Sequence, residues 1–584
     1  MTTSLIDADS LLVVDVGSVS TRAMLFDVVD GRYRFLASGQ APTTAGAPFR
    51  DVGEGVRLAI DKLQSVTGRT LIGDDERLIL KGAGGSSGVD AFAATISAGP
   101  PLKIMAAGLL EDVSLESICR LAATTYAGAV ETMCLTGRRP ADAQIDSILR
   151  LRPDLILLAG GTEGGASHSV LKLLDPIGLA CYLMPEDQRP QVLFAGNQEL
   201  DDEIRTSIGK VADVHFAANV RPALDVEQLD PAQTQLAAIT SQVRVRQIPG
   251  VKELSEWASG NLMPTSAAFG RLIRFLSKAS ATNKGVLGVD VGASATTLAA
   301  AFDGELVMGV YPQLGLGNGL SHLLENVRLE EITRWLALDI SDETVRDYLY
   351  NKALYPASLP ATQEDLVIEQ AITRQVLRSA VGRMNAGFPA GVSRSGAGLL
   401  PWFEPVVATG SVLTRAPGMA QTLLMLLDGL QPTGATTLVL DQSHLAAAMG
   451  VAAAVNPILV AQVLDSTTFL YLGTVISPVG NARPGTPVLR LKMTYETGHE
   501  AMVDVKQGSL EVLPLPLGQT ARLHLQPLHR YDVGMGGAGR SGRLNVHGGA
   551  LGVVIDARGR PLQLPEDAGR RRELFKKWLW TLGG

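Results

Sequence analysis

A pattern of buried strand, tight polar turn and second strand occurs twice in this chain, in residues 11–24 and 286–299. The first copy reads LLVVDVGSVSTRAM and the second VLGVDVGASATTLA. In each copy an Asp-Gly hairpin signal and a third apolar segment follow, and helical periodicity comes later. Because the two copies are separated by the length of a whole domain, the pattern predicts two related α/β domains rather than a solenoid.

The residue types in both turns suit the binding of phosphate groups. Glycine lets a phosphate approach the backbone, whose N–H groups bind its oxygens together with nearby hydroxyls. An aspartate at the end of a buried strand can hold Mg²⁺ or its water shell. The candidates are Asp15, Gly17, Ser18, Ser20 and Thr21 in the first turn, and Asp290, Gly292, Ser294 and Thr296 in the second.

Composition sets the domain organisation that we expect. A chain of 584 residues is too long for one hydrophobic core. Its 46% hydrophobic and 19% charged residues are typical of a globular protein, and a net charge of −8 gives no electrostatic reason to bind nucleic acid. We expect a first unit with a helical connector over 1–282, a second unit over 283–465, and an all-β domain over 466–584, where apolar and polar residues alternate.

The cysteines and the apolar segments indicate a cytoplasmic protein. The three cysteines have no paired or metal-like spacing, and the N-terminus lacks the features of a signal peptide. The apolar segment 444–464 is broken by Asn456 and Pro457, so we expect a buried helix and a turn there, not a membrane span. Residues 570–582 predict an amphipathic helix, for which docking of its tryptophans on its own domain is favoured over membrane contact.

Other possible sites are weaker. The loop GAGGSSG (82–88) lacks the lysine of a P-loop, and GMGGAGR (534–540) is not followed by a helix. No cluster of His and Cys predicts zinc, and His444 is expected in an ordinary structural position.

The motif order resembles the actin-like ATPase superfamily, in which two phosphate motifs are followed by a glycine-containing adenosine motif. Here DVGSVST and DVGASAT are followed by VVATGSVLTRAP, which places Gly410 and Ser411 in the adenosine motif. LILLAGGTEGG looks like the same element in the first unit, so Gly160 and Gly161 are either a structural echo or a second contact. The resemblance implies an α/β fold of duplicated actin-like (ribonuclease H-like) lobes, with ATP–Mg²⁺ in a cleft between them and Asp15 and Asp290 as the catalytic aspartates.

Further segments resemble one branch, the glutamate mutase accessory protein (MutL) family: GQAPTTAGAPFRDVGEGVRLAI, PLKIMAAGLLEDVS, PDLILLAGGTEGG and LFAGNQEL. Members are encoded beside adenosylcobalamin-dependent mutases. By analogy with reactivating factors, the resemblance implies a chaperone-like ATP-binding protein that serves a mutase subunit and exchanges its damaged cofactor. The corrinoid signature Asp-x-His-x-x-Gly is absent from the sequence, so we expect ATP and Mg²⁺ as ligands and no bound corrinoid. The oligomeric state stays open, with a homo-oligomer as one option.

One departure from the family pattern leaves ATP hydrolysis open. The second motif of the family resembles DVGGATTD, whereas this chain has Ala293 in place of the second glycine and Leu298 in place of the final acid. A methyl group at Ala293 is expected to crowd a phosphate. Two alternatives therefore remain: a non-catalytic scaffold that retains the fold, and a small-molecule kinase or hydantoinase-like ATPase.

Overall fold

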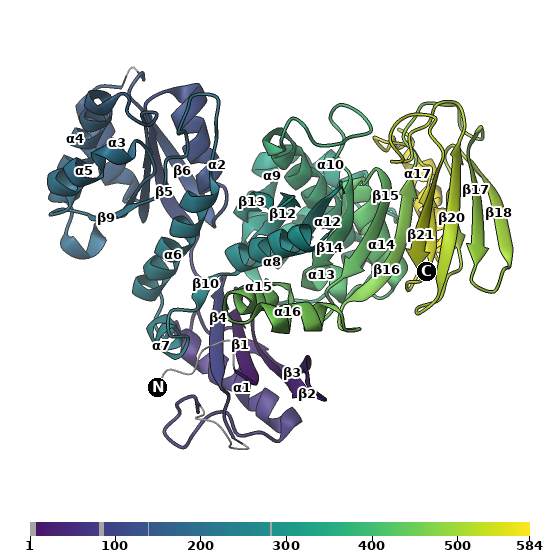
Figure 1. Cartoon of the computed structure of the whole chain (residues 1–584), viewed down its shortest axis with the longest axis horizontal. Helices are drawn as coiled ribbons and strands as arrows, with labels where there is room; N and C mark the ends of the chain where they lie inside the picture. Colours follow the sequence, from purple (N-terminus) through teal and green to yellow (C-terminus); the bar gives the residue numbers. More distant parts are fainter. Residues whose placement is uncertain (1–7, 81–86, 138, 281–282) are drawn as a thin grey trace. The chain divides into compact units, whose positions relative to one another are not determined.

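The computed structural model describes residues 8–80, 87–137, 139–280 and 283–584. Most of the glycine-rich loop 82–88 lies outside these residues. The chain divides into two compact units, which are described separately (Figure 1). The first comprises Met1–Ala268, Gly309–Pro312 and Ala447–Pro457, and the second comprises Phe269–Met308, Gln313–Ala446 and Ile458–Gly584.

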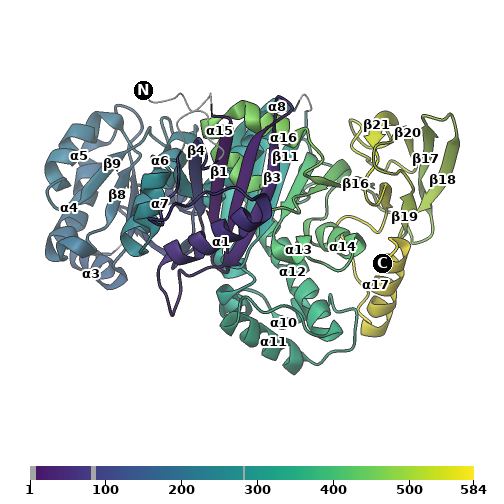
Figure 2. The ribbon, with the colours of Figure 1, turned by 90° about the horizontal axis from the view of Figure 1, so that it is seen from below.

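The first unit contains a five-stranded mixed sheet in the order β10-β4-β1-β2-β3. β1 is antiparallel to β2 and parallel to β4. Helix α1 (Val52–Thr67) begins where the Asp51 carboxylate accepts the N–H of Gly53 at 2.7 Å, and it lies across β1 to β3 (Figure 2). Gly39 permits this packing, because a Cβ there would lie 2.1 Å from the carbonyl oxygen of Ala59 in α1. The strands are β1 (Ser10–Val16), β2 (Ser20–Val29), β3 (Arg32–Pro42), β4 (Ala91–Ile96) and β10 (Leu262–Pro264).

A second sheet of the first unit is fully parallel, in the order β6-β5-β7-β8-β9. Its inner strands β5, β7 and β8 are mainly apolar and buried, as parallel strands covered on both faces require, and separate hydrophobic clusters cover the two faces of the sheet. The strands are β5 (Leu102–Gly108), β6 (Ala127–Cys134), β7 (Leu155–Ala159), β8 (Gln191–Phe194) and β9 (Asp213–Phe216). The helices around them are α2 (Glu116–Ala122), α3 (Ala141–Leu151), α4 (Ser167–Leu183), α5 (Asp201–Ile208) and α6 (Asp230–Gln247), and α7 (Val251–Trp257) follows.

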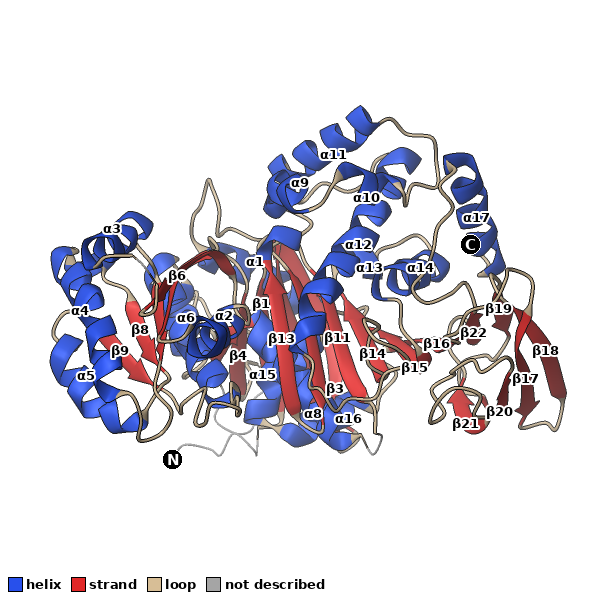
Figure 3. Ribbon diagram, turned by 90° about the horizontal axis from the view of Figure 1, so that it is seen from above, coloured by secondary structure: helices blue, strands red, loops and turns tan. Residues whose placement is uncertain are grey.

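An eight-stranded mixed sheet, in the order β13-β12-β11-β14-β15-β16-β22-β19, forms much of the second unit (Figure 3). Its strands are β11 (Gly285–Val291), β12 (Thr296–Phe302), β13 (Glu305–Tyr311), β14 (Phe403–Thr409), β15 (Gly434–Leu440), β16 (Leu470–Ser477), β19 (Leu510–Leu513) and β22 (Val553–Asp556). The helices of the second unit are α8 (Thr265–Ala279), which begins in the first unit, α9 (Leu323–Asn326), α10 (Leu329–Thr333), α11 (Asp342–Leu354), α12 (Gln363–Met384), α13 (Ser411–Thr414), α14 (Met419–Leu430) and α16 (Pro457–Leu464). Helix α15 (Ala446–Val455) lies almost entirely in the first unit.

The segment after residue 466 is rich in strands and lies within the second unit. A four-stranded antiparallel sheet has the order β18-β17-β20-β21, whereas β16, β19 and β22 hydrogen-bond into the eight-stranded sheet. The four strands are β17 (Pro487–Tyr495), β18 (Glu500–Lys506), β20 (Thr520–Pro527) and β21 (Gly542–His547). The predicted C-terminal helix is α17 (Ala568–Thr581), which buries Phe575 and Trp578 and leaves Trp580 80% exposed.

Buried ion pairs join the end of β22 to the helices of the second unit. The Asp428 carboxylate on α14 pairs with Arg374 on α12 at 2.9 Å and with Arg558 at 2.8 Å. Arg558 also pairs with Asp556 at 2.8 Å, and its guanidinium lies 4.5 Å from the ring centroid of Trp578. Both carboxylates are fully buried, so each depends on its arginines for compensation.

The apolar segment 444–464 forms the predicted helix, α15, but a second helix, α16, begins at Pro457 where a turn is predicted. Across the described part of the chain, no helix combines the length and the apolar character that crossing a bilayer requires.

Candidate functional site

The turn after β1 is built on one tight backbone contact. The Gly17 N–H donates to the carbonyl oxygen of Ser20 at 3.0 Å, and Val16 then pairs with Thr21 across the hairpin. A Cβ on Gly17 would lie 2.7 Å from that same oxygen, so the turn excludes a side chain at this position.

Asp15, next to this turn, has a firmly held carboxylate. Its Oδ1 accepts hydrogen bonds from the Thr95 hydroxyl at 2.7 Å and from the Thr265 hydroxyl at 3.0 Å. Its Oδ2 lies 3.9 Å from Nη1 of Arg22, and the residue is 8% exposed. Three groups from separate elements therefore fix Asp15, and Arg22 offsets its charge.

The turn after β11 repeats this backbone geometry within the second unit. The Gly292 N–H donates to the Ala295 carbonyl oxygen at 3.0 Å, and Val291 pairs with Thr296. Asp290 is in register with Thr409 on parallel strand β14, just as Asp15 is in register with Thr95 on β4. On the antiparallel side, Asp290 is in register with Thr297, where Asp15 has Arg22.

The threonine in each predicted motif lies on the opposite sheet face from the aspartate. Thr21 pairs with Val16 and Ala41, which both belong to the hydrophobic core beside α1. Asp15 directly precedes Val16 on β1, and neighbouring side chains of a strand point to opposite faces, so Asp15 lies on the other face of the sheet. Thr296, the counterpart of Thr21, is fully buried and donates its hydroxyl to the Leu314 carbonyl oxygen at 2.7 Å. The candidate serines, by contrast, are partly exposed in the turns: Ser18, Ser20 and Ser294.

Ala293 in the second turn faces a glycine-rich segment of its own unit. A Cβ on Gly317 would lie 3.1 Å from the Ala293 Cβ and 2.8 Å from its carbonyl oxygen. The Leu316 N–H donates to the Gly292 carbonyl oxygen at 3.0 Å, which holds this segment against the turn. The methyl group that departs from the family pattern is thus packed beside Gly317.

The predicted adenosine motif lies beside the second turn. Gly410 follows β14 with a φ of +110°, and a Cβ there would lie 2.3 Å from the Val291 carbonyl oxygen, so only glycine fits. Ser411 is exposed and begins the short helix α13. The two ends of this segment are joined by His444, whose Nδ1 lies 3.3 Å from the Thr409 hydroxyl and whose Nε2 lies 3.3 Å from the Thr414 hydroxyl.

Gly160 and Gly161 are not the first-unit counterpart of this motif, and that part of the interpretation is wrong. They follow β7, which belongs to the fully parallel sheet. The strand that pairs with β1 as β14 pairs with β11 is β4. The sequence carries a signal for this, because β4 ends in ATIS (94–97) and β14 ends in ATGS (408–411).

Sequence reasoning missed three residues that surround the aspartates and the adenosine motif: Thr95, Thr265 and His444. The repeated Ala-Thr-x-Ser would have identified Thr95. No local signal points to Thr265, which reaches Asp15 from a distant position in the chain.

The donors at these turns are those that a phosphate–metal ligand uses. Mg²⁺ prefers carboxylate oxygens and keeps several waters, so one aspartate together with ligand phosphates is a sufficient protein contribution. Among the described residues, no group of three or more His, Cys, Asp or Glu could hold a metal by itself.

The family model described as MutL protein matches residues 11–468. The Protein MutL of Clostridium tetanomorphum is 25% identical over 445 residues, which cover 71% of this chain and 88% of that protein. The chain belongs to the MutL protein family.

Solved structures resemble the chain more weakly. Nucleotide-free acetone carboxylase is 12% identical with a TM-score of 0.31, and the match covers 88% of this chain and 82% of that one. The activator of 2-hydroxyisocaproyl-CoA dehydratase from Clostridium difficile, with bound ADPNP, is 10% identical with a TM-score of 0.25 and coverages of 76% and 92%. TM-scores this low carry no argument about ligand or activity.

Proposed function

We propose that this member of the MutL protein family is an ATP-binding accessory factor that reactivates an adenosylcobalamin-dependent mutase, and that its two units are duplicated actin-like lobes. The observation that carries the nucleotide part is the pair of matching turns, in which Gly17 and Gly292 each donate to the carbonyl three residues later at 3.0 Å. The strand order also supports duplication. The first unit has the strand order β3-β2-β1-β4, and the second has the matching order β13-β12-β11-β14. The strand that precedes the turn is β1 in the first unit and β11 in the second. Each is antiparallel to the strand that follows the turn, β2 or β12, and parallel to the strand on its other side, β4 or β14.

In this proposal the turn backbones and the exposed serines bind phosphate oxygens, and Gly410 and Ser411 contact the adenosine. Asp15 and Asp290 hold Mg²⁺ through its water shell, and the metal neutralises phosphate charge when bound. Thr95 and Thr265 keep the Asp15 carboxylate oriented, and Arg22 lowers the cost of burying its charge.

The nucleotide part is tested by the shift in melting temperature of the full chain with Mg²⁺–ATP. A ligand that binds the native state alone must raise the melting temperature. We expect a shift that depends on both Mg²⁺ and ATP, and that is lost in Asp15→Asn and Asp290→Asn. Asp504→Asn, at an exposed ion pair on the four-stranded sheet, is the matched control and should keep the shift. No shift at millimolar Mg²⁺–ATP in the wild-type chain would refute nucleotide binding.

The mutase part is tested by recovery of activity. Glutamate mutase that has been inactivated during turnover is mixed with this chain, Mg²⁺–ATP and fresh adenosylcobalamin. We expect activity to return and the damaged corrinoid to be released, and both to fail with Asp15→Asn. Binding of ATP without any recovery, for this and other adenosylcobalamin-dependent mutases, would favour the scaffold alternative.

A further inference from the structure

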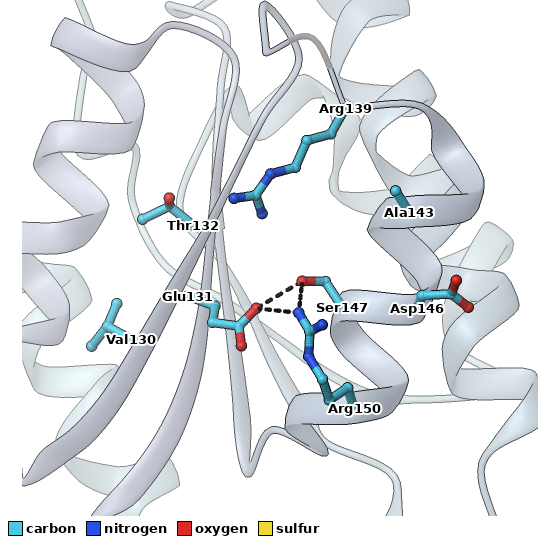
Figure 4. Close-up of a pocket in the computed structure, with 8 residues that line it drawn as sticks. All are labelled: Val130, Glu131, Thr132, Arg139, Ala143, Asp146, Ser147 and Arg150. Atoms are coloured by element: carbon cyan, nitrogen blue, oxygen red, sulfur yellow. Dashed lines mark hydrogen bonds and ion pairs between the residues drawn. The ribbon is translucent and has the colours of Figure 1, made fainter.

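A groove of about 660 Å³ lies between strand β6 and helix α3 in the first unit (Figure 4). One wall is the consecutive residues Val130, Glu131 and Thr132 of β6, and the other is one face of α3 from Ala143 to Arg150. Three residues of a strand and two turns of a helix each span about 10 Å. The groove therefore has the length of a short extended peptide and a volume within the range of ligand sites.

The β6 wall is the edge of a sheet. β6 is the terminal strand of the order β6-β5-β7-β8-β9, so one side of its backbone lacks a strand neighbour among the described residues. Its sequence AGAVETMC contains no proline or lysine, the residues that commonly protect such edges, and Gly128, Ala129 and Val130 are exposed. An unprotected edge with small side chains is a template for an added strand.

The groove contains one paired acidic side chain, Glu131, and one arginine, Arg139, whose positive charge has no partner among the described residues. Glu131 accepts a hydrogen bond from the Ser147 hydroxyl at 2.7 Å and lies 3.8 Å from the Arg150 guanidinium. Asp146 also lines the groove, with its carboxylate directed away from Arg139, whereas the Arg139 guanidinium extends into the groove (Figure 4). Within the described ranges, that guanidinium has no ion pair or hydrogen-bond partner. The groove thus presents one uncompensated positive charge beside an open strand edge.

We propose that this groove binds an extended acidic segment of a partner protein, which pairs with β6 as an additional strand and places a carboxylate against Arg139. Main-chain hydrogen bonds to β6 supply affinity, and Arg139 selects an acidic side chain. This inference does not depend on the nucleotide proposal, because it uses neither phosphate turn.

The test uses the full chain and a fluorescein-labelled peptide, Val-Glu-Val-Glu-Val-Glu-Val-amide, in fluorescence anisotropy. We expect binding about tenfold tighter than that of the matched Val-Gln peptide, as one charge-assisted hydrogen bond provides. Arg139→Gln should abolish this preference and Arg139→Lys should keep part of it. Arg346→Gln, at an exposed arginine of α11, is the control and should bind like the wild type.

Hydrogen exchange locates the bound peptide. Binding should slow exchange of amides in residues 128–132, and a peptide with N-methyl groups at alternate residues should neither bind nor protect. The proposal is overturned by no binding at 1 mM peptide, by an unchanged preference in Arg139→Gln, or by protection that lies elsewhere in the chain.

Discussion

The hydroxyl of Thr95 on β4 donates a 2.7 Å hydrogen bond to Oδ1 of Asp15 on β1, and the two residues are in register on neighbouring parallel strands. The bond is buried, and its acceptor is a carboxyl oxygen. Charge-assisted bonds of this kind are stronger than neutral ones, so this contact is expected to hold the aspartate in one orientation.

We predict that Thr95 and Asp15 are energetically coupled. In a double-mutant cycle of Thr95→Val and Asp15→Ala, the coupling free energy should be about 2 kcal/mol, as for hydrogen bonds to charged groups. Urea unfolding of the four proteins measures it. Additive effects of the two substitutions would mean that the bond contributes nothing to stability.

Alanine should be tolerated less well at Gly17 than at Gly292. The new Cβ would lie 2.7 Å from a backbone oxygen in the first turn and 3.0 Å in the second, and a backbone oxygen moves only with its strand. We expect Gly17→Ala to lower the free energy of unfolding by about 2 kcal/mol, as overpacking does, and Gly292→Ala to lower it by less. Urea denaturation of both variants measures the two losses in the free energy of unfolding. A larger loss for Gly292→Ala than for Gly17→Ala would contradict the geometry.

Removing Asp428 should destabilise the second unit strongly. Asp428→Leu leaves Arg374 and Arg558 buried without one of their carboxylate partners, which costs about 3–5 kcal/mol in comparable buried networks. The exposed pair between Arg490 and Asp504 provides the control, because Asp504→Leu should leave the urea midpoint almost unchanged. Equal shifts of the urea midpoint in Asp428→Leu and Asp504→Leu would show that burial of an ion pair does not increase its contribution to stability in this protein.

Asp556 should make stability depend on pH in the acid range. Burial raises the pKa of its carboxyl group, but the neighbouring Arg558 and Arg560 outweigh burial and hold the pKa below the ordinary value of 3.8. A lowered folded-state pKa adds stability that is complete above the unfolded pKa and is lost as pH falls below it. Urea unfolding between pH 6 and pH 3 should show a decline below about pH 4. The decline should be smaller in Asp556→Asn, and an identical slope would contradict the assignment.

The strands and turns around the phosphate motifs were predictable because their signals are local. A buried strand ending in Asp-x-Gly specifies its own hairpin, and both predicted copies are present as β1–β2 and β11–β12. The α/β class, the helix α15 and the C-terminal helix follow equally from periodicity, whereas α16 does not. Gly160 was assigned to the wrong element because a strand followed by glycines looks alike in any parallel sheet, and only strand pairing shows which sheet contains it.

By itself, the sequence determined that two Asp-Val-Gly turns exist, each between two apolar strands, since a hairpin signal acts within a few residues. Tertiary structure alone decided what surrounds the aspartates. Asp15 is held by Thr95, Thr265 and Arg22, whereas Asp290 has Thr297 in the register position of Arg22. Such differences depend on strand register and on chain segments far apart in sequence, which no local pattern encodes.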